Sequence, residues 1–151
     1  MIEYAEIENG MCVLEPSAGT GNIIDEVVKR YDTEVLAYEI NNNLCNLLIN
    51  KYPSYRVQVR QRDFLAVTDF QGCYERIVMN PPFENADDIK HIKHALTFLS
   101  PSGVLVALCA NGSRQREVLK PLADHWEVLP EGSFKQQGTN VNVAMLVIRN
   151  N

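Results

Sequence analysis

Short apolar runs alternate with amphipathic segments along almost the whole chain, and this alternation constrains the fold more than any other feature. The runs of strand type are residues 11–14, 34–40, 55–61, 74–79, 103–110, 126–129 and 141–149. Apolar residues at helical spacing predict helices over residues 22–31, 42–52, 87–99 and 113–125, the last bent or shortened by Pro121. Strands that take turns with helices predict an open, mainly parallel sheet covered on both faces.

The last two predicted strands have no helix between them, so we expect an antiparallel hairpin at one edge of the sheet. The predicted fold class is therefore α/β: a doubly wound, mainly parallel, seven-stranded sheet of the Rossmann-like type with a C-terminal antiparallel hairpin. The 151 residues contain no repeat or linker and correspond to a single domain, residues 1–151. Such sheets bind ligands beyond the carboxyl ends of their strands, where the strand order reverses.

Three of the predicted strands end in residues suited to a nucleoside. The loop after the first strand, residues 15–21, reads Glu-Pro-Ser-Ala-Gly-Thr-Gly. Its glycines permit a tight turn and close approach of a ligand, although a Gly-x-Gly pair alone fits many strand–helix turns. Glu39 ends the second strand, where acidic residues of nucleotide-binding units accept hydrogen bonds from a ribose. Asp63 and Phe64 follow the third strand and offer an acceptor and a ring face to an adenine.

The fourth strand is followed by the segment Asn80-Pro81-Pro82-Phe83. Two prolines fix the backbone and remove two N–H donors, which leaves the Asn80 side-chain oxygen and the Pro81 carbonyl as acceptors for a planar NH2 group. Phe83 offers a face for stacking. The nitrogen of such a group is a poor nucleophile, and two acceptors favour its pyramidal form and stabilise its developing positive charge. The segment thus predicts a reaction at an exocyclic amine or a side-chain amide, with the proton lost after transfer.

With these four strand ends, the chain resembles the class I S-adenosylmethionine-dependent methyltransferases. The amino-acid sequences of the first loop and of residues 80–83 are most similar to those of the DNA adenine-N6 methyltransferases, which belong to the NPPY/NPPF amino-methyltransferase type. The similarity covers about residues 13–147. It implies S-adenosylmethionine as cofactor, the catalytic residues Asn80, Pro81, Pro82 and Phe83, and the cofactor-binding residues Glu15, Pro16, Ser17, Ala18, Gly19, Gly21, Glu39, Ile40, Asp63, Phe64 and Asn80. Phe134 is the candidate for stacking on a flipped base, with a core position as the equal alternative.

The resemblance leaves the methyl acceptor open. We expect adenine N6 in DNA; the alternatives are an RNA base (adenine N6 or guanine N2), a protein glutamine N5, or an inactive cofactor-binding subunit. The formal net charge of -5 argues against a broad face that grips DNA, and we find no target recognition domain. We therefore expect a separate recognition subunit or a homo-oligomer. Only ten residues precede Met11, where the family usually has a further helix, so the cofactor pocket is expected to be open on one side.

The remaining features are those of a cytoplasmic protein without metal or membrane. The four cysteines have no spacing that would bind zinc, and His91 and His94 are interpreted as part of a solvated helix face, so we expect no metal site. The N-terminus lacks the pattern of a signal peptide. The longest apolar run, residues 104–110, is too short to cross a bilayer.

Overall fold

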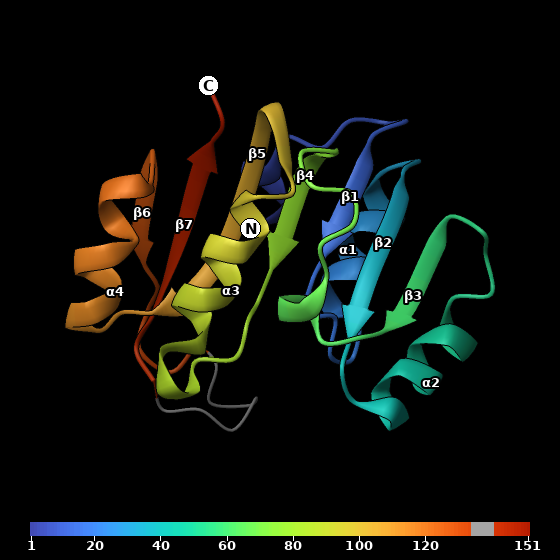
Figure 1. Cartoon of the computed structure of the whole chain (residues 1–151), viewed down its shortest axis with the longest axis horizontal. Helices are drawn as coiled ribbons and strands as arrows, with labels where there is room; N and C mark the ends of the chain where they lie inside the picture. Colours follow the sequence, from blue (N-terminus) through green and yellow to red (C-terminus); the bar gives the residue numbers. More distant parts are fainter. Residues whose placement is uncertain (134–140) are drawn as a thin grey trace.

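The computed structural model describes residues 1–133 and 141–151, and within them seven strands form one sheet. The strands are β1 (Cys12–Glu15), β2 (Glu34–Glu39), β3 (Val57–Gln61), β4 (Tyr74–Met79), β5 (Leu99–Ala110), β6 (His125–Val128) and β7 (Val143–Arg149). Their order is β3-β2-β1-β4-β5-β7-β6 (Figure 1). Strands β1 to β5 run parallel, and β7 pairs antiparallel with both β5 and β6. The predicted α/β sheet with a C-terminal antiparallel hairpin is confirmed.

Helices cover both faces of the sheet because neighbouring strand residues point to opposite sides. The helices are α1 (Asn22–Arg30), α2 (Asn42–Lys51), α3 (Asp87–Leu96) and α4 (Ser113–Val118), with short 3-10 helices η1 (Ile2–Ala5), η2 (Phe64–Ala66), η3 (Glu84–Ala86) and η4 (Lys120–Leu122). Val13 belongs to an apolar cluster with residues of η1, α1 and α2. Its neighbour Leu14 belongs to the other cluster, with residues of η2 and α3 and with Leu119, which precedes η4. Each face therefore has its own core.

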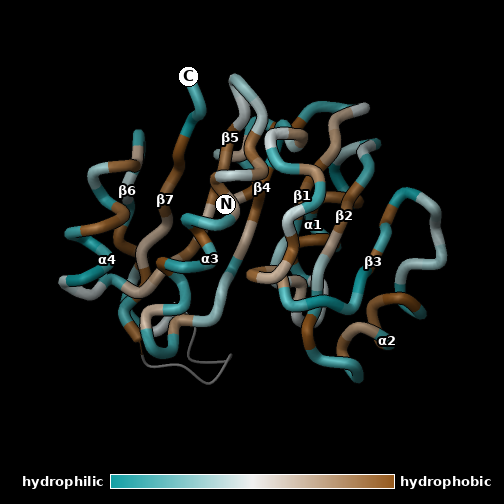
Figure 2. Tube along the Cα trace, viewed as in Figure 1, coloured by the Kyte–Doolittle hydropathy of each residue, from teal (hydrophilic) through white to brown (hydrophobic). Residues whose placement is uncertain are grey.

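The hydropathy of each strand agrees with its position in the sheet. The inner strands β5 and β7 are mostly hydrophobic, while the edge strand β3 is largely hydrophilic along its length (Figure 2). This is the pattern expected when inner strands are covered on both faces and the edge strand is partly solvated. Among residues 1–133 and 141–151, no helix has the length and apolar character needed to span a membrane.

The predicted boundary between α3 and β5 is wrong. Helix α3 ends at Leu96, not residue 99, because the Thr97 N–H and hydroxyl both bond to the His94 carbonyl and close the last turn. Strand β5 then begins at Leu99, ahead of the predicted residue 103. The shortening of the fourth helix by Pro121 is confirmed, since α4 ends at Val118 and Pro121 lies in η4.

The site lies where the strand order reverses. Strand β1 is flanked by β2 and β4, so the chain leaves the end of β1 toward one face and the end of β4 toward the other. Residues 16–21 connect β1 to α1, and residues 80–86 connect β4 to α3. These two loops face each other at the carboxyl edge of the sheet, which is where such folds bind ligands.

Candidate cofactor and catalytic site

Two cavities, of about 550 and 440 Å³, open at this edge and share Ser17 and Gly19 as walls. The larger is lined by Met1, Ile2, Ser17, Ala18, Gly19, Thr20, Asn22, Ile23, Glu26, Asn80 and Leu108. The smaller is lined by Pro16, Ser17, Gly19, Tyr38, Glu39, Ile40, Arg62, Asp63, Phe64, Leu65, Pro82, Asp87 and His91. Most of the predicted site residues are thus brought together from four strand ends. Glu15, Gly21, Pro81 and Phe83 line neither cavity.

Glu39 organises the glycine loop, residues 16–21. Its Oε2 accepts the Gly19 N–H at 2.8 Å, and its Oε1 accepts the Asn41 N–H at 2.8 Å. Gly19 has a φ of 53°, which suits glycine. Because each carboxylate oxygen has two acceptor sites, Glu39 can hold the loop and still accept a hydrogen bond from a ligand hydroxyl.

The back of the glycine loop is clamped by the end of α2. The Tyr52 hydroxyl lies 2.6 Å from Asp25 Oδ1 and 3.0 Å from the Gly21 carbonyl oxygen. Lys51 Nζ donates to Asp25 Oδ2 at 2.6 Å and to the Thr20 carbonyl at 3.3 Å. Burial raises the pKa of Asp25, but the hydrogen bonds from Lys51 and Tyr52 outweigh burial and leave that pKa below its usual range. The sequence patterns pointed to none of these three side chains.

Gly21 is required by this clamp. Its φ is 86°, and a Cβ atom there would lie 2.6 Å from the Tyr52 hydroxyl oxygen and 2.8 Å from a methyl carbon of Leu48. Any larger residue would therefore combine an unfavourable backbone with a collision. The packing of the loop against α2 is thus a reason for glycine at position 21, in addition to the tight turn that the motif predicted.

Glu15, at the end of β1, is a buried acid with unused hydrogen-bonding capacity. Its side chain is 1% exposed. Oε1 accepts the Ser17 N–H at 3.2 Å, whereas Oε2 is buried and has no partner among the described residues. Burial raises the pKa of Glu15 from 4.5 to about 8; the Ser17 N–H lowers it and the charge of Glu39 raises it. A cationic or hydrogen-bonding group bound beside the loop would satisfy this oxygen.

The segment Asn80 to Phe83 has one polar side chain, that of Asn80. Asn80 is half-buried, lines the larger cavity and makes no side-chain hydrogen bond with the described part of the chain. Pro81 is buried, and the exposed Pro82 reaches the smaller cavity. Phe83 is half-buried and packs against the cluster on the η1 and α1 face. The amide of Asn80 is thus the group in this segment best placed to bind a ligand.

Asp88 fixes the segment from behind, and sequence patterns gave it no role. It is fully buried, and its Oδ2 accepts the Ala110 N–H at 2.8 Å. Gln115 Nε2 donates to both of its oxygens at 3.0 and 3.1 Å. The start of α3 is therefore bonded to the end of β5 and to α4.

Between Phe83 and α3 the chain passes through Asn85 and Ala86, whose φ angles of 53° and 59° lie in the left-handed region.

The residues after β3 divide between cavity and core. Asp63 Oδ1 accepts the Leu65 N–H at 2.9 Å, and its other oxygen has no hydrogen-bond partner among the described residues and can accept from a ligand. Phe64 is 2% exposed, and its ring packs against Tyr38 and Phe98 with centroids 5.7 and 5.2 Å away. It lines the smaller cavity with little ring surface to spare for stacking. Phe134, the predicted stacking residue, lies outside the described residues.

The interpretation of the two histidines of α3 as a solvated face is wrong. Both are half-buried, and the His94 ring packs edge-on to Phe64 and Phe98 at 4.9 and 5.1 Å. The apolar side of α3 is broader than the sequence periodicity suggested, because η2 covers it. In residues 1–133 and 141–151, no group of three or more His, Cys, Asp or Glu side chains is arranged to hold a metal ion.

One curated relative is similar in sequence over part of the chain. The modification methylase CviBIII of Paramecium bursaria Chlorella virus NC1A is 35% identical over 82 residues. The match covers 54% of this chain and 21% of the viral protein, so the chain spans about a fifth of that protein's length.

Solved structures show the same fold at low sequence identity. TrmN from Thermus thermophilus matches with a TM-score of 0.79 at 20% identity, over 99% of this chain and 47% of that one. A geranyl diphosphate C-methyltransferase from Streptomyces coelicolor A3(2), in complex with Mg²⁺, geranyl diphosphate and S-adenosyl-L-homocysteine, matches with a TM-score of 0.76 at 11% identity. That match covers 99% of this chain and 76% of the other.

The sequence model of the methyltransferase small domain family matches residues 5–135. This span includes both loops at the strand-order reversal and both anchoring carboxylates, Glu39 and Asp88. The unpartnered oxygen of Glu15, the acceptors Glu39 and Asp63 and the open glycine loop suit a cationic nucleoside cofactor. The chain therefore belongs to the methyltransferase small domain family, and the cofactor of its site is S-adenosylmethionine.

Proposed function

We propose that this chain is an S-adenosylmethionine-dependent methyltransferase that methylates an exocyclic amine, and that the amine is N6 of adenine in DNA. The observation that carries the proposal is the side-chain amide of Asn80, which lines the larger cavity opposite the glycine loop and makes no hydrogen bond to a described residue. An amide oxygen and an adjacent proline carbonyl are acceptors for both hydrogens of an NH2 group. The same pair suits no hydroxyl or thiol equally well, because neither presents two hydrogens.

The cofactor's adenosine is assigned to the smaller cavity. There Glu39 can accept from the ribose hydroxyls, Asp63 can accept from the adenine amino group, and Ile40 and Pro82 supply apolar walls. The methionine part is assigned to the glycine loop, which follows the buried Glu15, whose Oε2 has no partner among the described residues. Because the two cavities share Ser17 and Gly19, one extended ligand along the loop can reach from Glu39 to Asn80.

The chain's own residues prepare the amine rather than deprotonate it. When bound, S-adenosylmethionine supplies an electrophilic methyl group on a sulfonium. Asn80 Oδ1 and the Pro81 carbonyl hold the two N–H bonds, which favours the pyramidal nitrogen and stabilises the positive charge that develops there. The extra proton leaves the nitrogen after transfer, when the methylated amine is acidic enough for water to accept it. No residue has to act as a strong base.

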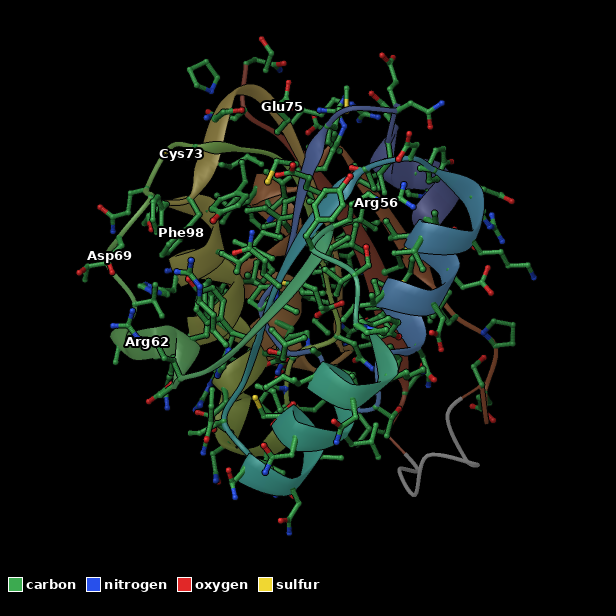
Figure 3. All side chains as sticks on the ribbon, turned by 90° about the vertical axis from the view of Figure 1, so that its right-hand side faces the viewer. Arg56, Arg62, Asp69, Cys73, Glu75 and Phe98 are labelled. Carbon is green, nitrogen blue, oxygen red and sulfur yellow. The ribbon has the colours of Figure 1, made fainter. Side chains whose placement is uncertain are left out.

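Sequence similarity to a viral modification methylase supports DNA as the substrate. The distribution of charge supports a catalytic domain that needs help with binding. Arg56 and Arg62, near opposite ends of the β3 edge, are neutralised by Asp32 and Asp69 (Figure 3). The net charge of -5 argues against a broad cationic face, so we propose that a recognition subunit, a further domain or a second copy contributes to DNA binding.

The test compares wild type with Asn80→Ala, using labelled S-adenosylmethionine and adenine-containing DNA. We expect label in N6-methyladenine after digestion to nucleosides for wild type, and a rate lower by about 10²–10³-fold for the variant. Calorimetric titration with S-adenosylhomocysteine should give similar affinities for both proteins. Equal transfer by the two proteins, or none by either, would overturn the catalytic assignment.

Competing acceptors in the same assay separate the alternatives. Transfer to RNA or to a glutamine-containing peptide in preference to DNA would retain the amine chemistry and reject the DNA substrate. Tight cofactor binding without transfer to any acceptor would instead identify an inactive cofactor-binding subunit.

A further inference from the structure

His91 projects from α3 into the wall of the smaller cavity and has an unsatisfied ring nitrogen. It shares that wall with Asp63 and Phe64, and its ring centroid lies 6.3 Å from that of Phe64. Nδ1 is buried and has no hydrogen-bond partner among the described residues. Buried polar atoms without partners are rare in folded proteins and call for a reason.

The neighbouring histidine of α3, His94, shows how the fold provides a hydrogen-bond partner for a ring that is purely structural. His94 Nε2 lies 2.9 Å from the Val67 carbonyl oxygen, and its ring is packed between Phe64 and Phe98. His94 lines neither cavity. Of two histidines one turn apart, the one with its nitrogen engaged belongs to the core, and the one with its nitrogen unengaged faces the cavity.

Burial favours a neutral His91 ring. It lowers the pKa of His91 and outweighs the carboxylates of Asp87 and Asp63, which raise it; His94 and Lys90 lower it by smaller amounts. A neutral imidazole has one N–H donor and one acceptor. Asp63, which faces the same cavity, offers acceptor oxygens only. The two side chains together therefore present an acceptor and a donor to whatever occupies the cavity.

We infer that His91 binds the adenine of the cofactor. Its N–H would donate a hydrogen bond to the ring nitrogen beside the adenine amino group, and that amino group would donate to Asp63. The inference rests on the proposed placement of adenosine in the smaller cavity. Adenine carries a donor amino group next to the acceptors N1 and N7, so adjacent acceptor and donor side chains match it. A half-turn of the imidazole exchanges Nδ1 with a carbon of similar size, so the nitrogen can be presented without backbone movement. His91 is thus assigned as a residue that selects the base.

The test is a cycle of protein and ligand changes measured by calorimetry. Wild type, His91→Phe and His91→Gln are titrated with S-adenosylhomocysteine and with its 7-deaza and 1-deaza analogues. We expect wild type to bind one deaza analogue about 10-fold more weakly than the parent, because the imidazole N–H then loses its acceptor. His91→Phe should bind the parent about 10-fold more weakly and should not discriminate against that analogue. The Gln variant, which retains an N–H donor, should recover part of both effects.

The matched control is His94→Gln, a change of the same residue type one turn away and outside the cavity. It should preserve the discrimination against the deaza analogue, and thermal unfolding should show that all variants fold. The inference is overturned if His91→Phe binds the parent ligand like wild type, or loses affinity yet discriminates as wild type does. Two other outcomes would instead reject the placement of adenosine in the smaller cavity: no binding of S-adenosylhomocysteine by wild type, or an affinity that Asp63→Ala leaves unchanged. Failure of the proposed function is thereby distinguished from failure of the His91 assignment.

Discussion

The two loops that meet at the strand-order reversal are held in opposite ways. Side chains from the end of β2 and from the end of α2 bond directly to the backbone of the glycine loop. The segment from Asn80 to Phe83 receives no such bonds within the described residues; its prolines and the buried Asp88 beyond it provide the rigidity. The two loops therefore have different roles: the loop that binds the cofactor is preorganised by its neighbours, and the segment proposed to react keeps its polar group available for the substrate.

The largest expected effect concerns Glu15, at the start of the glycine loop. Its pKa is raised to about 8, so the folded protein holds this proton more tightly than the unfolded chain does. The resulting stability is fully present below pH 4.5 and is lost as the pH rises toward 8. Glu15→Gln should remove this loss, worth at most about 5 kcal/mol at about 1.4 kcal/mol per pKa unit. Urea unfolding of both proteins at pH 5 to 9 measures it; a difference between them that does not change with pH would contradict the prediction.

Gly21→Ala should damage the preorganised loop. The left-handed φ and the collision with Tyr52 and Leu48 should together cost about 3 kcal/mol of unfolding free energy and weaken cofactor binding. Gly10→Ala is the matched control, because Gly10 has a similar φ of 87° but open space where its Cβ would lie. The difference between the variants isolates the packing against α2, and equal losses would show that only the backbone matters.

Sequence reasoning found the parts of the site that depend on short stretches of chain. The meeting of Glu39 and Asp63 at one cavity could be predicted because Glu39 ends β2 and Asp63 follows the end of β3, and parallel strands bring their ends to one edge. The clamp by Tyr52 could not, because Asp25 and Tyr52 are 27 positions apart and no periodicity relates them. The same holds for Asp88 and Gln115. Phe64 shows the converse: its position after β3 was recognised, but its burial depends on η2 packing over α3.

Tyr52→Phe should loosen the glycine loop without a collision. The change removes the hydroxyl that contacts Asp25 and the Gly21 carbonyl, so we expect a loss of about 1 kcal/mol in unfolding free energy. The affinity for S-adenosylhomocysteine should fall a few-fold while the turnover rate at saturating cofactor stays unchanged. Tyr31→Phe is the control, because the Tyr31 hydroxyl makes no hydrogen bond with a described residue. A lower turnover rate with unchanged affinity would place Tyr52 in the reaction rather than in loop positioning.

The smallest effect tests the reactive side of the comparison, where Ala86 adopts a left-handed φ of 59° just before α3. Glycine removes that strain but adds flexibility to the unfolded chain, so Ala86→Gly should change the unfolding free energy by less than about 1 kcal/mol. Ala123→Gly, at an ordinary φ of -90°, gains nothing in return and should destabilise more. If Ala86→Gly keeps its cofactor affinity but loses turnover, the strained turn serves to aim Asn80. If turnover is also retained, Asp88 and the two prolines are sufficient to hold the segment.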